Sequence, residues 1–134
     1  MNKFDVISMM RTWFKSISDH EPVEKLVPML DLKNLKMKFP EATLETKEQF
    51  EQWYASVSEK FFDVEHILKQ IDIKITGDKA EVFLVVNWKA QTREPKQAYS
   101  VKIDCDAYQE WVVVKGLDGK PKISSYVVLD IIDN

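Results

Sequence analysis

Hydrophobic side chains recur at helical spacing in three segments of the first half of the chain. They lie in Asp5–Ile17, Val23–Leu30 and Thr46–Phe61, and polar residues occupy the other side of each helical wheel. Pro28 lies inside the second segment and is expected to kink or shorten it. The third segment opens with Thr46-Lys47-Glu48-Gln49, which has the form of a capping box. The pattern therefore predicts three N-terminal helices, each with one apolar face.

Alternation of apolar and polar residues predicts strands before and after the third helix. Leu35–Phe39 alternates like a strand, and Glu41–Glu45 is expected to be a short extended segment. Val64–Ile75 and Ala80–Ala90 flank the turn Thr76-Gly77-Asp78-Lys79, so they are predicted to pair as a hairpin. Because the centre of Ala80–Ala90 is apolar on both faces, we expect this strand in the middle of the sheet.

The last third of the chain predicts two further strands. Gln97–Lys115 alternates over so great a length that the strand must bend, and a β-bulge is one way to do so. Ile123–Ile132 completes the sheet. Phe50 and Trp53 of the third helix are expected to pack against the inner face of this sheet. The strand residues expected on that inner face are Ala107, Gln109, Ser125 and Val127.

Length and composition narrow the class of protein. The 134 residues suit a single domain, spanning 1–134, that buries its own core. Cys105 is the only cysteine, which excludes an intrachain disulfide and a zinc site built on several thiolates. No segment approaches the ~20 apolar residues of a membrane span, and the first residues lack the apolar core of a secretory signal. We therefore expect a cytoplasmic protein with no membrane partner.

The charge pattern argues against nucleic acid as a partner. The formal net charge is −3, and lysines and glutamates are interspersed along the chain. No basic field is present that could attract a phosphate backbone. Apolar residues occupy both phases of several strands, more than one layer of helices can cover. We therefore expect a homodimer formed through the outer face of the sheet.

The order of these elements and several short motifs resemble one superfamily. The matching motifs, which cover nearly the whole chain, are Asp31-Leu32, Phe39-Pro40, Phe50–Ala55, Gly77-Asp78-Lys79-Ala80, Trp111 and Asp118-Gly119-Lys120. In these the chain resembles the nuclear-transport-factor-2-like superfamily, and within it the SnoaL-like and ketosteroid-isomerase-like proteins. The resemblance implies an α+β, cystatin-like cone, in which three N-terminal helices pack on a strongly curved, mainly antiparallel sheet. It also implies a pocket between helices and sheet.

The resemblance implies catalytic positions that this chain fills with other residues. Enzymes of this type often carry an aspartate as general base before the proline after the first strand, and this position holds Phe39. The isomerases carry a tyrosine donor on the first helix, and the matching residue is Phe14. A second donor, a protonated carboxylic acid on the long strand, corresponds to Gln109, or to Asp106 or Glu110 if the alignment shifts. A donor without a base removes no proton, so we assign no catalytic residue.

Other residues are candidates for binding. Tyr54 matches a pocket tyrosine of the third helix, and Trp88 is an aromatic residue of the hairpin that could line an apolar cavity. His66 lies near the position where some SnoaL-like relatives carry a cavity histidine. With two histidines in the chain, a three-histidine metal site is excluded, and no metal or cofactor is implied. The candidate ligand-binding residues are thus Phe14, Phe39, Tyr54, His66, Trp88 and Gln109.

Two functions follow from these residues, and a third remains open. The first is a SnoaL-like domain that binds a small apolar molecule in its cone without ketosteroid-isomerase-type catalysis. The alternative is an isomerase, dehydratase or cyclase type of enzyme with a displaced base, either His66 or Asp104. A protein-interaction module differs from both because it predicts a cone filled by side chains. Because position 39 holds a phenylalanine in place of the aspartate base, the sequence favours the first function.

Overall fold

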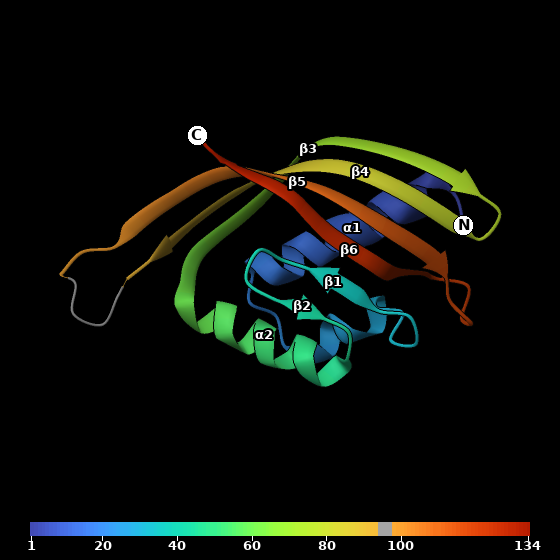
Figure 1. Cartoon of the computed structure of the whole chain (residues 1–134), viewed down its shortest axis with the longest axis horizontal. Helices are drawn as coiled ribbons and strands as arrows, with labels where there is room; N and C mark the ends of the chain where they lie inside the picture. The colour runs from blue at the N-terminus through green and yellow to red at the C-terminus, as the bar shows by residue number, and fades with distance from the viewer. Residues whose placement is uncertain (94–97) are drawn as a thin grey trace.

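The computed structural model describes residues 1–93 and 98–134 and shows an α+β fold. Four long strands form a curved sheet that arches over the first helix, and the second α-helix lies at the bottom of the view, beneath two short strands (Figure 1). The six strands have the order β2-β1-β6-β5-β4-β3, and neighbours are antiparallel except for the parallel pair β1 and β6. The elements are α1 (Lys3–Ser18), η1 (Val23–Lys25), η2 (Val27–Met29), β1 (Lys36–Lys38), β2 (Thr43–Leu44), α2 (Lys47–Lys60), β3 (Phe61–Thr76), β4 (Lys79–Thr92), β5 (Val101–Lys115) and β6 (Pro121–Asp133).

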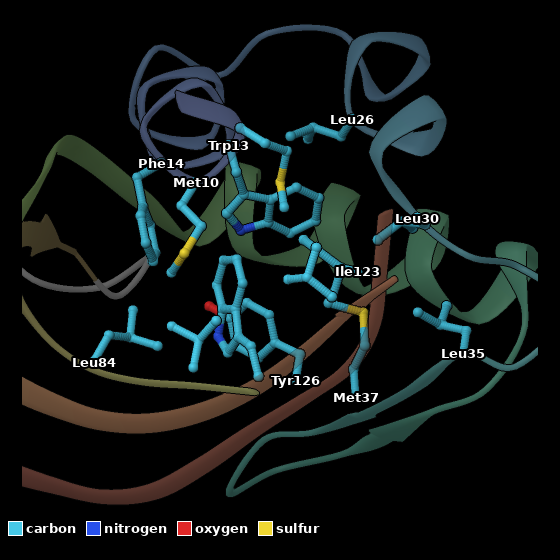
Figure 2. Packing of buried hydrophobic residues seen from close by; sticks show 14 of the residues in the cluster. Met10, Trp13, Phe14, Leu26, Leu30, Leu35, Met37, Leu84, Ile123 and Tyr126 are labelled. Atoms are coloured by element: carbon cyan, nitrogen blue, oxygen red, sulfur yellow. The ribbon is translucent and has the colours of Figure 1, made fainter. Parts of the chain in front are cut away.

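Helix α1 forms the centre of the core. It begins at an Asn2 cap whose side chain accepts from the Asp5 N–H, while the Asp5 carboxylate accepts from the Asn2 N–H. One face of the helix is buried, and Trp13 on that face has no exposed surface. Figure 2 shows the Trp13 ring among Met10, Leu26 and Tyr126, so residues from α1, the following turns and the sheet share one core.

The segment predicted as the second helix is not an α-helix. It forms the separate 3₁₀ helices η1 and η2, closed by hydrogen bonds from Leu26 N to Val23 O and from Leu30 N to Val27 O. Pro28 has no N–H and its ring would clash with the carbonyl of a preceding helical turn. Leu26 and Leu30 are still buried, so the apolar stripe serves the core without a regular helix. Across the described residues, no helix is long and apolar enough to cross a bilayer.

Helix α2 starts where the capping pattern predicts. The Thr46 hydroxyl accepts from the Gln49 N–H at 3.1 Å, but the Gln49 side chain accepts from the Glu45 N–H rather than from Thr46. Phe50 is fully buried and packs on Trp13, with ring centroids 5.7 Å apart. The helix ends at Lys60, and Phe61, predicted as its last residue, begins β3 instead.

The hairpin β3–β4 turns at Gly77, whose φ of 61° is a conformation that favours glycine.

Strand β5 begins at Val101, so it is shorter than the predicted Gln97–Lys115, and Gln97 lies outside the described residues. Ala107 and Gln109 of β5 are buried on the inner face, as expected.

The predicted orientation of β6 is wrong. Ser125 lies opposite Val112 of β5, and Val127 lies opposite Glu110. Opposed residues of an antiparallel pair share a face, and Val112 and Glu110 alternate with the inward residues of β5. Ser125 and Val127 therefore point to the outer face of the sheet.

Two β-bulges in β6 cause this change of phase. The register with β5 shifts so that Ser124 and Leu129 have no partner. Each bulge inserts one residue, so the alternation reverses its phase after each of them. The residues of β6 that face the interior are consequently Ile123, Tyr126, Val128 and Ile131.

Candidate functional site

A cavity of about 510 Å³ lies between the helices and the concave face of the sheet. Its inner part is formed by buried residues of β4, β5 and β6, and its outer part by exposed residues of α2 and of the segment after β1. The side chains that line it are mostly apolar. They include Ile17, Phe39, Trp53, Val57, Phe61, Val64, Val86, Trp88, Cys105, Ala107, Tyr126, Val128 and Ile131.

Aromatic rings form much of the cavity wall. Phe39 stacks on Trp53, with ring centroids 4.2 Å apart and planes at 11°. Phe61 meets Trp88 edge to face at 5.0 Å. The Trp53 indole N–H donates to Glu41 Oε1 at 3.0 Å, so the stacked pair is fixed at the exposed end of the cavity. Phe39 stands where the resemblance implies a general base, and its ring is instead part of the aromatic wall of the cavity.

His66 of β3 supplies a polar group to the cavity. Its Nδ1 lies 2.8 Å from the Ser18 hydroxyl, and its ring stacks on Phe14 at a centroid distance of 5.3 Å. Burial lowers the pKa of His66 to about 4, so the imidazole is neutral at pH 7. Phe14 lies behind this ring and is not among the cavity-lining residues.

Gln109 and Tyr126 supply polar groups to the inner part of the cavity. Gln109 is buried on β5, and its Oε1 accepts from the Trp111 indole N–H at 2.9 Å. Tyr126 of β6 is also buried, and its ring lies 4.5 Å from that of Trp111. Burial raises the pKa of the Tyr126 phenol, which is therefore neutral across the physiological range.

Tyr54 does not line the cavity. Its hydroxyl donates to the backbone carbonyl of Glu21, and its ring stacks on Phe50 within the core. Burial raises the pKa of this phenol as well. The Tyr54 hydrogen bond thus connects α2 to the segment that follows α1. Of the six candidate binding residues, Phe39, His66, Trp88 and Gln109 line the cavity, and Phe14 and Tyr54 do not; that any of them binds a ligand stays a prediction.

The acidic residues of β5 face away from the cavity. Asp104 and Asp106 alternate with Cys105, which lines the cavity, so both carboxylates lie on the outer face. Asp106 accepts from Lys69 at 2.6 Å, and this bond lowers the pKa of Asp106 to about 2. Asn87 donates to both carboxylates. In residues 1–93 and 98–134, no group of three potential metal ligands is brought together.

Sequence reasoning missed several polar residues of the cavity, namely His20, Glu41, Ser56, Ser58, Lys60 and Tyr126. Tyr126 could not be placed, because the bulge at Ser124 decides which face it occupies. Glu41 lies two residues after Phe39 and brings a carboxylate to the exposed end of the cavity. Its proximity to the Phe39-Pro40 motif was the one signal that could have indicated it.

No family model matches the chain, and no curated protein matches it in sequence. Solved structures do resemble it. A nuclear transport factor 2 superfamily protein from Salmonella enterica is 14% identical over 93% of this chain and 87% of its own, with a TM-score of 0.80. An NTF2-like protein from Cytophaga hutchinsonii is 22% identical over 100% of both chains, with a TM-score of 0.73.

Another similar structure carries an enzyme's name. A candidate scytalone dehydratase from Novosphingobium aromaticivorans is 16% identical over 98% of this chain and 86% of its own, with a TM-score of 0.75. Identities this low establish the fold and leave the activity open. A protein from Nostoc punctiforme that is described as having a cystatin-like fold is 13% identical over 94% of this chain and 88% of its own, with a TM-score of 0.75. The chain therefore has the cystatin-like fold that these NTF2-like structures share.

Proposed function

We propose that the cavity binds a small apolar molecule, held by shape and by one or two polar contacts, without ketosteroid-isomerase-type catalysis. The observation that carries this proposal is the cavity itself, about 510 Å³ with a mostly aromatic and aliphatic lining. Pockets of ~300–1,000 Å³ with such a lining and a few polar groups are typical of small-molecule sites. A protein-interaction module with a filled cone fits this cavity less well.

The polar groups of the inner cavity favour binding over proton abstraction. Gln109 is an amide, Tyr126 is a phenol with a raised pKa, and His66 is a neutral imidazole. Proton abstraction needs a base whose pKa lies near the working pH, and losing a positioned base typically costs ~10²–10⁴-fold in rate. Phe39 offers no base, and Glu41, the lining carboxylate among the described residues, is exposed and accepts a hydrogen bond from Trp53.

The alternative is an isomerase, dehydratase or cyclase type of enzyme with a displaced base. His66 favours it, because the histidine lines the cavity and the Ser18 hydroxyl orients its ring. Its lowered pKa makes it a weak base at pH 7. Asp104, the other candidate base, lies on the opposite face of the sheet, so the alternative rests on His66 alone.

A pair of matched variants tests the binding proposal. Ala107→Leu adds bulk to a buried, cavity-lining position, whereas Ala55→Leu adds the same bulk to an exposed position of α2. Calorimetric titration with fluorene, a flat hydrocarbon, should show binding to the wild type and to Ala55→Leu, and at least about tenfold weaker binding to Ala107→Leu. Equal affinity for all three proteins would place the binding outside the cavity and contradict the proposal.

A steroid isomerisation assay on the same preparations tests the alternative. We expect no turnover above background. Turnover that the wild type shows and His66→Ala loses would instead make the protein an enzyme with His66 as its base.

We also propose that two copies pair through the outer sheet face. Phe83, Val112 and Val127 are half-buried there and line a shallow hollow together with charged neighbours such as Glu81 and Glu110. Among the helices that the structure describes, none covers this face (Figure 1). A second copy would remove these apolar groups from water.

A further inference from the structure

Strand β3 forms one edge of the sheet, and its second half is a regular, open edge. Among the described residues, β4 is its only partner strand (Figure 1). Between the bulge at Lys69 and the turn at Gly77, the segment Gln70–Thr76 pairs with β4 without a register shift. Natural edge strands are usually covered, short or interrupted by bulges, because their free main-chain groups can pair with another chain. This segment, the β3 edge, has no bulge and can accept a further strand.

The hairpin turn determines which main-chain groups of the β3 edge are free. Thr76 and Lys79 close a two-residue turn, and residues that close such a turn exchange hydrogen bonds across the hairpin. Hydrogen-bonded and non-hydrogen-bonded pairs alternate along the two strands, so Lys74 and Asp72 also bond to β4. The N–H and C=O groups that point away from the sheet are those of the alternate residues, Ile71, Ile73 and Ile75.

The side chains of the β3 edge are apolar on one face and charged on the other. Its isoleucines lie on the inner face and pack against the core. Asp72 and Lys74 are exposed on the outer face, opposite Phe83 and Glu81 of β4. Glu81 is paired with Lys79 at 3.8 Å, and neither Asp72 nor Lys74 takes part in an ion pair within the described residues. The edge thus presents one negative and one positive charge, separated by one residue.

Two copies of the β3 edge match each other in one antiparallel register. When Ile73 lies opposite Ile73 of a second copy, each Asp72 faces the other copy's Lys74. The free isoleucine groups then bond to each other, so Asp72 and Lys74 form a non-hydrogen-bonded pair with Cα atoms about 4.5 Å apart. Opposite charges at such positions are stabilising, and like charges are destabilising. The two nearest registers that keep the isoleucine hydrogen bonds place Asp72 opposite Asp72, or Lys74 opposite Lys74.

We propose that the β3 edge joins two copies of this chain into one continuous sheet, in the register centred on Ile73. The pairing ends where the Lys69 bulge of one copy meets the Gly77 turn of the other. This contact is separate from the binding function and from the pairing of outer faces, so it links outer-face pairs into a larger assembly. Exposed ion pairs and solvent-exposed hydrogen bonds each contribute little. The contact therefore forms at several hundred micromolar, whereas the outer faces pair at tens of micromolar.

A register-specific disulfide tests this contact. At several hundred micromolar, an oxidised mixture of Asp72→Cys and Lys74→Cys proteins should form a mixed disulfide, because the opposed Cα atoms lie within the ~4.4–6.8 Å that a disulfide spans. The Lys74 and Asp72 that remain keep one ion pair in the mixed contact. Either variant alone should cross-link at least about fivefold less, because its thiol faces a charged side chain. Asp72→Cys mixed with Glu65→Cys is the matched control and should also cross-link less, since Glu65 is exposed on the same strand but beyond the Lys69 bulge.

Amide hydrogen exchange separates the edge contact from outer-face pairing. Raising the wild-type concentration from tens to several hundred micromolar should slow exchange of the Ile73 N–H, which gains an acceptor, by at least about twofold. Exchange of the Lys74 N–H, which already bonds to β4, should not change. Asp72→Lys should abolish the slowing at Ile73, and adding Lys74→Asp should restore it, because the two charges are then exchanged.

Two results would overturn the edge contact. One is an Ile73 N–H that exchanges equally fast at both concentrations or is slowed equally in Asp72→Lys. The other is a mixture of the two cysteine variants that cross-links no more than each variant alone. Both results would leave the binding function of the cavity untouched, since no residue of the β3 edge lines it.

Discussion

His66 shows how one residue acquires its properties from distant parts of the chain. Its ring lies between Phe14 and the cavity, and its Nδ1 meets Ser18, a residue 48 positions earlier in the chain. The sequence could indicate His66 as a candidate only through the resemblance to SnoaL-like proteins. It could not indicate Ser18, because no local pattern links the end of a helix to the start of a distant strand. The neutral state of His66 is likewise a consequence of packing.

The lowered pKa of His66 predicts a loss of stability in mild acid. The unfolded chain takes up a proton near pH 6.5, whereas native His66 does so only near pH 4. The free energy of unfolding should therefore be unaffected by this group above about pH 7 and should fall as the pH drops toward 4, by roughly 2 kcal/mol at pH 4.5. Urea unfolding of the wild type and of His66→Gln at pH 7 and pH 4.5 measures this difference.

His66→Gln should lose less stability than the wild type over that interval. His20→Asn is the control, because His20 lies in an exposed turn with a positive φ that asparagine accommodates. An identical pH dependence for the wild type and His66→Gln would show that His66 is not buried in its neutral form.

At the scale of elements, the order of helices and strands follows from the pattern of apolar residues. Which side chains of β6 lie on the inner face of the sheet does not follow from it. Alternation gives the phase of a strand only up to the next bulge. Ser124 and Leu129 are the bulged residues, and neither has a side chain that marks a bulge in sequence. The second predicted helix fails for a reason that is visible in sequence, since Pro28 interrupts it. The Gly77 turn was predicted correctly because its backbone geometry requires a particular residue.

The cap of α2 should contribute measurably to stability. Thr46→Ala removes the acceptor for the Gln49 N–H and should lower the free energy of unfolding by about 1 kcal/mol. Thr12→Ala is a matched control within α1, where the hydroxyl bonds back to the Ser8 carbonyl and alanine is the better helix former. Chemical denaturation should show no loss for Thr12→Ala. Equal losses for both variants would mean that the cap is not the source of the effect.

At the scale of the whole molecule, the curved sheet has two different faces. Its concave face packs on α1 (Figure 1). That face also forms the cavity, whereas the convex face carries the Lys69–Asp106 ion pair beside apolar residues. The sequence could predict the cone and an excess of apolar strand residues. It could not decide which residues lie at the cavity, because that depends on the bulges of β6 and on how far α2 extends before Phe61 begins β3.

The convex face predicts a dimer in solution. Sedimentation at tens of micromolar should give twice the chain mass of 15.7 kDa. Phe83→Lys places a charge on that face and should shift the protein to a monomer, while Ala55→Leu on α2 should leave the dimer intact. A wild-type monomer, or a dimer that Phe83→Lys leaves unchanged, would contradict this assembly.

The central claim, that the cavity is a binding site for an apolar molecule, is tested most directly by mapping a bound molecule onto the structure. In an NMR titration of nitrogen-15-labelled protein with fluorene, the Trp88 and Trp53 indole N–H signals and the backbone amides of Val86 and Ala107 should move together and saturate. Signals of Phe83 and Val112 on the outer face should stay in place. No change up to the solubility limit of fluorene, or changes confined to the outer face, would contradict the account.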